Sequence, residues 1–210
     1  MPAMRRRRLP APRAARASRF TRAGARGQAI IEFAFFFVVI MFLLAGVVDI
    51  GGLLNVHLAV VYASRQGART GSAVGPIPTA DCAIIGAVHS ALLSQPNLTL
   101  NTITIYKAGS DGQPTTTSGG ALAEDVYPGA VDCVGGVITS TVSGMPVTAS
   151  PDNWDPAVDA TLRVITPFAE DSLGVQLRYT YTFHFSLLGA TFTSSDNAVF
   201  PMEPSGGTSS

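Results

Sequence analysis

Apolar residues fill one early stretch of the chain almost without interruption. Nearly every residue from Ala29 to Val48 is apolar. At 1.5 Å per residue, a helix of about 20 residues spans roughly 30 Å, which is the thickness of the hydrocarbon core of a bilayer. A cleavable secretory signal has a shorter apolar region that ends at a small-residue site, and no A-x-A pattern follows here. The run therefore predicts a single membrane-spanning helix.

A helical pattern continues beyond the apolar run. Small and apolar residues recur there at spacings of three and four, which is typical of one packed helical face. They are Leu53, Val56, Val60, Ala63 and Gly67. Gly46, Gly51 and Gly52 predict a bend or a melted turn, because a glycine costs up to about 1 kcal/mol relative to alanine in a helix. The segment GPIP at 75–78 ends the helix, because proline cannot continue it.

The following sequence predicts a short helix and two strands. In TADCAIIGAVHSALLSQP, Thr79 or Asp81 caps the start of a helix, and apolar residues share one face of it. The β-rich stretch NLTLNTITIYK, residues 97–107, predicts a strand, and GGVITSTVS, residues 135–143, predicts a second one. The irregular stretch between them and the last strand contains Trp154, which we expect to close a sheet edge.

The clearest strand covers residues 175–185, where apolar and polar residues alternate without exception. This alternation predicts an antiparallel strand with one buried face and one exposed face. The apolar positions are Val175, Leu177, Tyr179, Tyr181, Phe183 and Phe185, and the polar ones are Gln176, Arg178, Thr180, Thr182 and His184. The predicted fold class is α+β: a long N-terminal helix with a transmembrane half, followed by a small extracytoplasmic domain with an antiparallel β-sheet and a packed short helix.

Charge divides the chain near residue 27. Residues 1–27 carry nine arginines and no acidic residue, and the rest carries five basic and fourteen acidic residues. A basic arm of this kind is one signature of nucleic-acid binding. Here it stands directly before a predicted span, and basic residues in that place stay in the cytoplasm. We therefore expect a cytoplasmic N-terminus, an extracytoplasmic domain and no nucleic-acid partner.

One carboxylate, Glu32, interrupts the apolar run and lies five residues after Gly27. A carboxylate inside a membrane costs several kcal/mol unless it has a partner. In one interpretation Glu32 lies at the cytoplasmic interface and contacts the headgroups. In the other the chain is cut after Gly27, so that Gln28 gains a free amine one helical turn from Glu32. That amine and the carboxylate would pair within one chain or between neighbouring chains.

The stretch RGQAIIEFAFFFVVIMFLLAGVVDIG, followed by YASRQGARTGS, resembles the TadE-like proteins of tight-adherence (Flp-type) pilus systems. Those proteins have Gly-Gln-Ala, two aliphatic residues and Glu-Phe, then a spanning helix, an Asp-x-Gly step and an Ala/Arg-rich helix. The matching positions are Gly27, Gln28, Ala29, Glu32, Phe33, Asp49, Gly51, Ala68 and Arg69. The resemblance covers Arg26 to Thr70. The segment is also similar to the processing site of type IV pilin-like proteins, although the leader of 27 residues is longer than many pilin leaders.

The resemblance implies a minor pseudopilin, a structural subunit of pilus assembly. A prepilin peptidase would cut between Gly27 and Gln28, and Glu32 and Phe33 would act in helix packing or as partners of the new amine. The implied partners are membrane lipid, the peptidase and other pilin-like subunits, and the implied location is the inner (cytoplasmic) membrane, crossed once. The expected divisions are a basic cytoplasmic leader at 1–27, the transmembrane helix and its continuation at 28–74, the extracytoplasmic domain at 75–203 and a disordered tail at 204–210.

The two cysteines, Cys82 and Cys133, predict a disulfide in an extracytoplasmic domain. It would tie the short helix to the loop before the second strand. The alternatives are free thiols, or a metal site with histidine, for which the three histidines lack the usual close spacing. Asp152 and Asp155 stand in a turn, where aspartate usually serves the turn itself; calcium binding is the alternative.

Catalytic motifs are missing from the sequence: there is no G-x-S-x-G, H-E-x-x-H, phosphate loop or G-x-G-x-x-G. We therefore expect no enzyme activity, no catalytic residue, no cofactor, no metal and no small-molecule substrate. Two other classes of protein stay open. One is an unprocessed single-pass anchor that presents an extracytoplasmic binding domain, and the other is a secreted hydrolase with a signal peptide.

Overall fold

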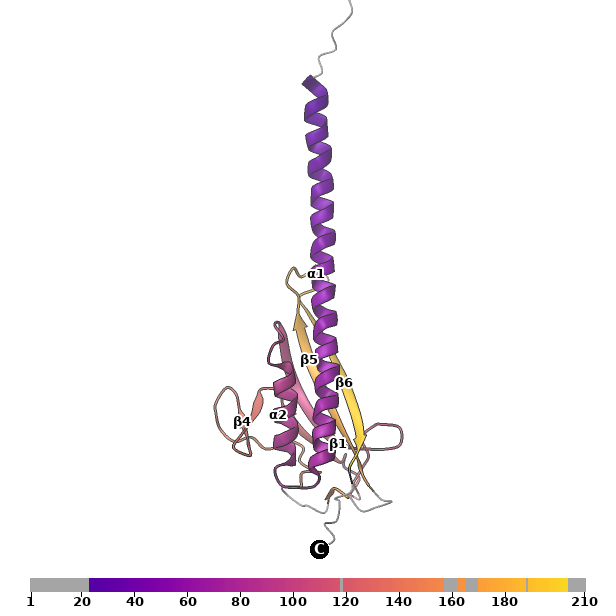
Figure 1. The fold of residues 1–210 in the computed structure, drawn as a ribbon, viewed down its shortest axis with the longest axis vertical. Coiled ribbons are helices and arrows are strands. Elements are labelled where there is room, and N and C mark those ends of the chain that lie inside the picture. Colours follow the sequence, from indigo (N-terminus) through magenta and orange to yellow (C-terminus); the bar gives the residue numbers. More distant parts are fainter. Residues whose placement is uncertain (1–22, 118, 157–161, 165–169, 188, 204–210) are drawn as a thin grey trace, which may run out of the picture. The chain divides into compact units, whose positions relative to one another are not determined.

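The structure is a computed structural model that describes residues 23–117, 119–156, 162–164, 170–187 and 189–203. By contacts the chain forms two compact units, Met1–Leu43 and Leu44–Ser210. Helices and strands follow one another along the chain as shown in Figure 1. They are α1 (Ala23–Val74), α2 (Ala80–Leu92), β1 (Leu98–Ala108), β2 (Glu124–Pro128), β3 (Val131–Val134), β4 (Val137–Ser140), β5 (Ser172–Thr182) and β6 (Thr191–Pro201). The predicted α+β class is confirmed. The predicted disordered tail lies outside the described residues.

The first helix, α1, is unbroken over 52 residues and belongs to both units. Helical structure continues through Gly46, Gly51 and Gly52, so the predicted melted turn is wrong. Each glycine costs about 1 kcal/mol, but most helical stability in proteins comes from the packing of a helical face, and α1 is packed from Asp49 onward. The helix ends at Val74, where the sequence predicted its end.

A four-stranded antiparallel sheet with the strand order β2-β1-β5-β6 is the centre of the second unit. Strand β5 is an inner strand, with Ile105 of β1 opposite Val175 on one side and Ala198 of β6 opposite Val175 on the other. The predicted strands at 97–107 and 175–185 are thus confirmed as β1 and β5. The segment around Trp154 lies along β2, an edge strand: backbone groups of Ser150 and Pro151 bond to Val126, and Trp154 is buried, as predicted.

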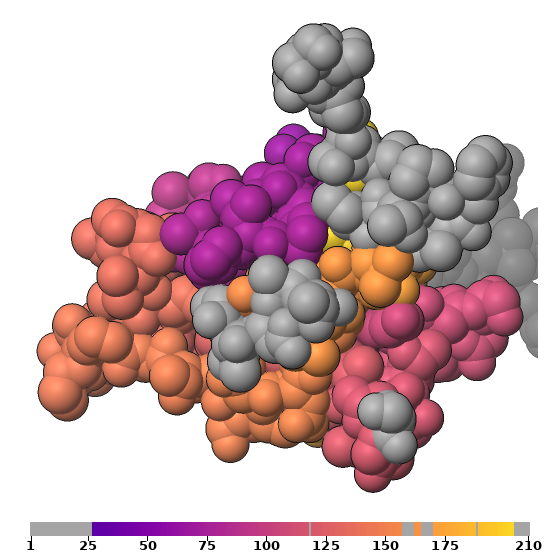
Figure 2. Space-filling model, turned by 90° about the horizontal axis from the view of Figure 1, so that it is seen from below, coloured from indigo at the N-terminus to yellow at the C-terminus, as the bar shows by residue number. Residues whose placement is uncertain are grey.

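Within the second unit, α1 and β5 run antiparallel along each other. His57 Nδ1 lies 3.0 Å from Tyr179 Oη, and Gly71 approaches Leu173. From His57 to Gly71 a helix rises about 21 Å, and from Tyr179 back to Leu173 a strand spans about 20 Å. Because these lengths agree, one face of α1 follows β5 from His57 to Gly71. Figure 2 shows the C-terminal end of α1, in purple, at the surface of the domain.

The predicted packing face of α1 is confirmed, since Val56, Val60 and Ala63 are at most 2% exposed. Two glycines on this face allow close approach of the second helix. A Cβ at Gly67 would lie 2.7 Å from Val88 Cγ2, and a Cβ at Gly71 would lie 2.6 Å from Ile84 Cδ1. The side chains of Val88 and Ile84 of α2 therefore pack directly against the backbone of α1 at these two points.

Three details differ from the expectations. Thr79 precedes α2, but its side chain makes no capping hydrogen bond. The strand predicted at 135–143 is only β4, and it pairs with β3 in a separate two-stranded sheet. Strand β5 ends at Thr182, and Phe185 is 56% exposed rather than buried, because the chain leaves the ladder there and turns toward β6.

A disulfide joins Cys82 in α2 to Cys133, so the predicted bond is present. Cys133 lies in strand β3 rather than in a loop before a strand. The bond therefore fixes the β3–β4 hairpin to α2, which β3 also contacts directly.

Replacing both cysteines by serine should lower the free energy of unfolding by about 2–4 kcal/mol. The two residues are 51 positions apart, so without the bond the unfolded chain gains the entropy of a long open loop. Urea unfolding of the oxidised parent and of the double variant measures the difference. The reduced parent is the matched control and should behave as the double variant does; equal stability of all three would contradict the expectation.

Candidate functional site

The four residues of the predicted processing segment lie within about two turns of α1. Helix α1 begins at Ala23, so the bond between Gly27 and Gln28 is inside the helix, about one turn from its start. The side-chain amide of Gln28 donates a hydrogen bond to Glu32 Oε1 at 3.3 Å. The ring of Phe33 stacks on that of Phe37, with the ring centres 6.2 Å apart. The structure thus brings Gln28 and Glu32 together in the intact chain.

The backbone nitrogen of Gln28 is part of a peptide bond here, so the pairing of a free amine with Glu32 stays a prediction. A peptidase needs an extended substrate, and the first turn of a helix opens more easily than its middle. Gly27 helps, because glycine is the least helix-favouring residue apart from proline. A Cβ at Gly27 would have no heavy atom within 4 Å. The fold of this chain therefore gives no packing reason for a glycine at this position.

Helix α1 contains a segment that is long and apolar enough to cross a membrane, with a mean hydropathy of 2.7. The large apolar side chains from Ile30 to Ile50 are 47–77% exposed. Nothing in the described parts of the chain covers them, so either lipid or other helices must do so in place of water.

A buried carboxylate stands where this apolar segment ends. Asp49 is 0% exposed, and its Oδ1 accepts hydrogen bonds from the backbone N–H groups of His184 at 3.0 Å and of Phe185 at 3.1 Å. These two residues follow β5, in the loop that leads to β6. Asp49 therefore fastens the β5–β6 loop to α1 at the end of the apolar run.

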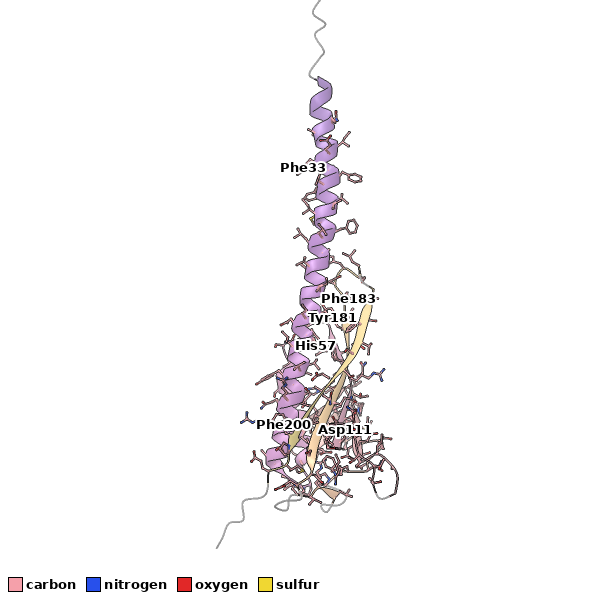
Figure 3. The ribbon with its side chains drawn as sticks, turned by 90° about the vertical axis from the view of Figure 1, so that its right-hand side faces the viewer. Phe33, His57, Asp111, Tyr181, Phe183 and Phe200 are labelled. Atoms are coloured by element: carbon pink, nitrogen blue, oxygen red, sulfur yellow. A yellow bond between two sulfur atoms is a disulfide. The ribbon has the colours of Figure 1, made fainter. Side chains whose placement is uncertain are left out.

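Gly52, one turn further on, leaves room for an aromatic side chain from β5. A Cβ at this position would lie 2.2 Å from Tyr181 Oη. The Tyr181 ring packs edge-on against Phe183 at 5.2 Å, and Figure 3 shows both rings together with His57 where β5 meets α1. Burial raises the pKa of Tyr181, and the charge of Asp49 raises it further. Neither Tyr181 Oη nor Asp49 Oδ2 has a hydrogen-bond partner among the residues that the structure describes.

The sequence placed Asp49 only in a family pattern, without a role, and indicated Gly51 and Gly52 only as a weak point of the helix. The structure assigns roles to Asp49 and to Gly52. The one signal in the sequence was a carboxylate directly after a membrane-length apolar run, which is an expensive place for an unpartnered charge.

Gly52→Ala should lower the free energy of unfolding by about 1–3 kcal/mol, because the new methyl group overlaps the Tyr181 hydroxyl. Tyr181→Phe alone should cost little, since that hydroxyl has no partner among the described residues. In the double variant the nearest ring atom would be Cζ at 3.3 Å, so most of the loss should disappear. Urea unfolding of the four proteins measures the coupling. Gly51→Ala is the control, because a Cβ there meets nothing within 4 Å; additive effects of the two substitutions would contradict the assigned contact.

A second cluster of charges is buried between α2 and β2. Arg163 Nη2 donates to Asp81 Oδ1 and lies 3.4 Å from Asp125 Oδ2. Tyr127 Oη also donates to Asp81, at 3.0 Å. The guanidinium lies over the Trp154 ring, 4.5 Å from its centre, and Arg163 is 2% exposed.

Burial raises the pKa of both carboxyl groups in this cluster. The pKa of Asp125 rises to about 8, first through desolvation and then through the charge of Asp81; desolvation also raises the pKa of Asp81, while Arg163 opposes the rise. One cation therefore lies close to Asp81 and Asp125, and the charge of a third carboxyl group, Asp155, raises the pKa of both further. At neutral pH Asp125 keeps its proton. Because Arg163 and the two aspartates are almost completely buried, the cluster fixes α2 against β2 and offers no access to a substrate. In the described parts of the chain, no group of three or more His, Cys, Asp or Glu side chains is placed to hold a metal ion.

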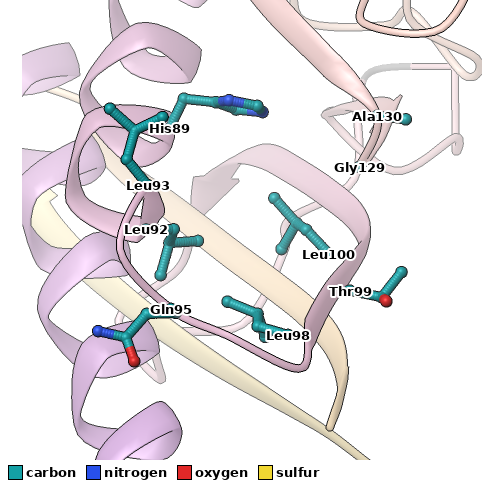
Figure 4. Close-up of a pocket in the computed structure, with 9 residues that line it drawn as sticks. All are labelled: His89, Leu92, Leu93, Gln95, Leu98, Thr99, Leu100, Gly129 and Ala130. Carbon is teal, nitrogen blue, oxygen red and sulfur yellow. The ribbon is translucent and has the colours of Figure 1, made fainter. Parts of the chain in front are cut away.

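A cavity of about 310 Å³ lies between the end of α2 and the start of β1. Figure 4 shows its lining, in which four leucines lie beside His89, Gln95, Thr99, Gly129 and Ala130. The main lining residues are His89, Leu92, Leu93, Gln95, Leu98 and Leu100. No cluster of polar groups converges on it, so its chemistry does not select a ligand.

The observations so far define a class of protein: a membrane-length apolar helix that continues into the packing face of an α+β domain. Residues 27–69 match the family model described as TadE-like protein. This match confirms the resemblance indicated by the sequence and associates the chain with pilus proteins of the Tad type, which are components of pilus assembly and not a known family of enzymes. Comparisons with curated proteins and with solved structures give no match.

Proposed function

We propose that this protein is a minor pseudopilin of a tight-adherence (Flp-type) pilus system, processed after Gly27 and packed through α1 against other pilin-like subunits. The observation that carries the proposal is the TadE-like match, which begins at Gly27 and includes the apolar part of α1. In this role the protein is a structural subunit, and the one chemical step that it undergoes is the removal of its leader by the peptidase.

The exposed apolar face of α1 supports packing against other helices. In a bilayer the side chains between Ile30 and Ile50 meet lipid, and in an assembly they meet the equivalent helices of neighbouring subunits. Nine arginines precede the span and hold the N-terminus in the cytoplasm. Removal of the leader takes away all nine charges and thereby the main force that keeps the helix end at the cytoplasmic face.

Processing would also reverse the electrostatics at the start of the helix. In the intact chain the first turn of α1 contains no acidic residue, and a block of arginines precedes it, which is unfavourable next to the positive end of a helix dipole. After a cut at Gly27, Glu32 would be the fifth residue, close to the new N-terminus and its amine. The hydrogen bond from Gln28 to Glu32 shows that this spacing brings the two side chains within reach.

A pseudopilin of this kind has a defined topology and defined partners. The leader at 1–27 is cytoplasmic, the segment at 28–74 crosses the inner membrane once and continues as a helix, and the domain at 75–203 is extracytoplasmic. The partners are membrane lipid, a prepilin peptidase and other pilin-like subunits. The disulfide between Cys82 and Cys133 supports an oxidising compartment for the domain.

The mature N-terminus tests the proposal directly. We expect the protein isolated from membranes of cells that contain a prepilin peptidase to begin at Gln28 and to be lighter than the full chain of 21.8 kDa by roughly 3 kDa. The same cells without the peptidase are the control and should yield the full chain. Intact mass and terminal sequencing decide between the outcomes. The full chain in both strains would favour the second candidate, an unprocessed anchor that presents its domain outside the cytoplasm.

A further inference from the structure

We propose that the described part of the loop between β5 and β6, residues 183–187, is a second membrane contact that inserts into the outer interface of the bilayer next to the exit of α1. This inference rests on the proposed membrane anchorage of α1. The loop would contact lipid, through the apolar side chains of Phe185 and Leu187.

The loop lies at the level of the chain where the membrane should end. Asp49 is the first charged residue after the apolar run that begins at Ala29, and its carboxylate holds the backbone of His184 and Phe185. Both hydrogen bonds are within the second unit, so the loop and residues 44–50 of α1 are placed together by direct contact. A bilayer crossed by the apolar run therefore has its outer surface beside this loop.

The composition of the loop suits an interface with lipid. Phe185 is 56% exposed and Leu187 is 42% exposed, and Phe192, just after the loop, is 43% exposed. No Asp, Glu, Lys or Arg occurs between Arg178 and Asp196, although the chain after residue 27 carries fourteen acidic and five basic residues. The one titratable side chain on the loop, His184, is exposed and lies 2.9 Å from the side-chain amide of Asn97 through its Nε2.

The adjoining part of α1 continues the same apolar surface. Val47, Val48 and Ile50 are 67%, 52% and 47% exposed, and they flank the residue to which the loop is bound. Large exposed apolar side chains thus occur both on the loop and on the part of α1 to which Asp49 binds it. If α1 crosses a bilayer, lipid surrounds the point where the helix leaves it. A protein partner of the loop would first have to displace that lipid.

Asp49 makes the insertion possible for the backbone. A backbone N–H group that enters a poorly hydrated region must keep a hydrogen-bond partner, or the transfer is unfavourable. The N–H groups of His184 and Phe185 have that partner in Asp49 Oδ1. The buried carboxylate therefore replaces water as the hydrogen-bond acceptor of these two N–H groups.

Tryptophan fluorescence in vesicles tests the proposal with three single variants of the full chain. Phe185→Trp reports on the loop, Phe36→Trp reports on the span, and Val134→Trp is a matched control on the β3–β4 hairpin, where the valine is 61% exposed. Native Trp154 is 1% exposed and gives the same background in each protein. The vesicles contain phosphatidylethanolamine and phosphatidylglycerol, with or without bromine atoms on the upper part of the acyl chains as the quencher.

We expect brominated lipid to quench Phe185→Trp and Phe36→Trp strongly and to leave Val134→Trp at the level of the parent, with a blue shift for Phe185→Trp relative to Val134→Trp. Quenching of Phe36→Trp without quenching of Phe185→Trp would overturn the loop contact and leave the proposed anchorage intact. No quenching of either would overturn both. Equal quenching of Phe185→Trp and Val134→Trp would also overturn the proposal, because the contact would not be specific to the loop. A Phe185→Trp that is unquenched by lipid but shielded from iodide would identify a protein contact instead.

Discussion

Arg163→Met should lower the free energy of unfolding by about 3–5 kcal/mol, the largest loss that we expect from one substitution in the domain. Arg163 donates to Asp81 and lies close to Asp125, and all three side chains are at most 3% exposed. Methionine fills much of the arginine stem volume and still contacts Trp154. The loss therefore comes from a carboxylate that is left in the interior without its cation. Urea unfolding of the chain in detergent micelles, followed by Trp154 fluorescence, measures it.

The double variant Arg163→Met/Asp81→Asn is the matched control for this loss. It removes the cation and the anion together, and replacement of a whole buried ion pair is often close to neutral. We expect it to recover a large part of the stability lost in Arg163→Met. A double variant as unstable as the single one would show that the guanidinium acts through packing on Trp154, and not through Asp81.

The same cluster should give the domain a pH dependence of stability. The pKa of Asp125 is about 8 in the folded protein, against an ordinary value of 3.8, so between these values the folded state holds a proton that the unfolded state has released. The stability from this group is therefore complete below about pH 4 and is lost as the pH rises through about 8. Asp125→Asn, which has no proton to lose, should show a flatter stability profile over that range than the parent.

The parts of the fold that could be predicted from the sequence are those with a clear period. Helix α1 beyond its apolar run, helix α2 and strands β1 and β5 each have a face that is buried against a neighbour, and that face appears in the sequence as apolar spacing. Strand β6 has no such signal, because TFTSSDNAVFP is mostly polar. It lies at the edge of the sheet, where it pairs along all of β5, and one of its contacts with α1 is polar: Ser64 donates to Asp196 at 2.6 Å.

Strand β2 and the Asp49 contact could not be predicted for a different reason. The sequence EDVYP places an aspartate, Asp125, on a buried face, and it can stay there only because Arg163 arrives from 38 positions later. Asp49 likewise binds backbone groups that lie 135 and 136 positions away. Backbone N–H groups occur at every residue except proline, so the sequence gives no indication of which ones a carboxylate will bind. Local spacing did place Gln28 and Glu32 within reach of each other, since their hydrogen bond is within about one helical turn.

Gly27→Leu should abolish processing, so that the roughly 3 kDa of the leader stays on the protein. A branched side chain fills the space that a peptidase needs at the cut, and leucine also strengthens the helix that must open there. The fold itself should be unaffected, because a Cβ at this position meets no atom within 4 Å. Gly46→Leu is the matched control: it is equally free of contacts, lies in the same helix and should be processed like the parent. Processing of Gly27→Leu at the parental rate would exclude Gly27 as the residue before the cut.

Glu32→Val should leave processing largely intact and impair assembly. Valine is more favourable than glutamate inside a membrane, so insertion of α1 should not suffer. The loss is the acceptor that lies one turn from Gln28, which now bonds its side-chain amide and after the cut would face its own amine or that of a neighbouring subunit. Glu32→Gln separates charge from hydrogen bonding: it keeps an acceptor oxygen and should rescue assembly only in part if the amine needs a carboxylate. We expect Glu32→Val to begin at Gln28, to stay in the membrane and to be missing from crosslinked complexes with other pilin-like subunits. If it assembles like the parent, Glu32 lies at the headgroups as an interfacial side chain, and the pairing of amine and carboxylate has no part in the assembly.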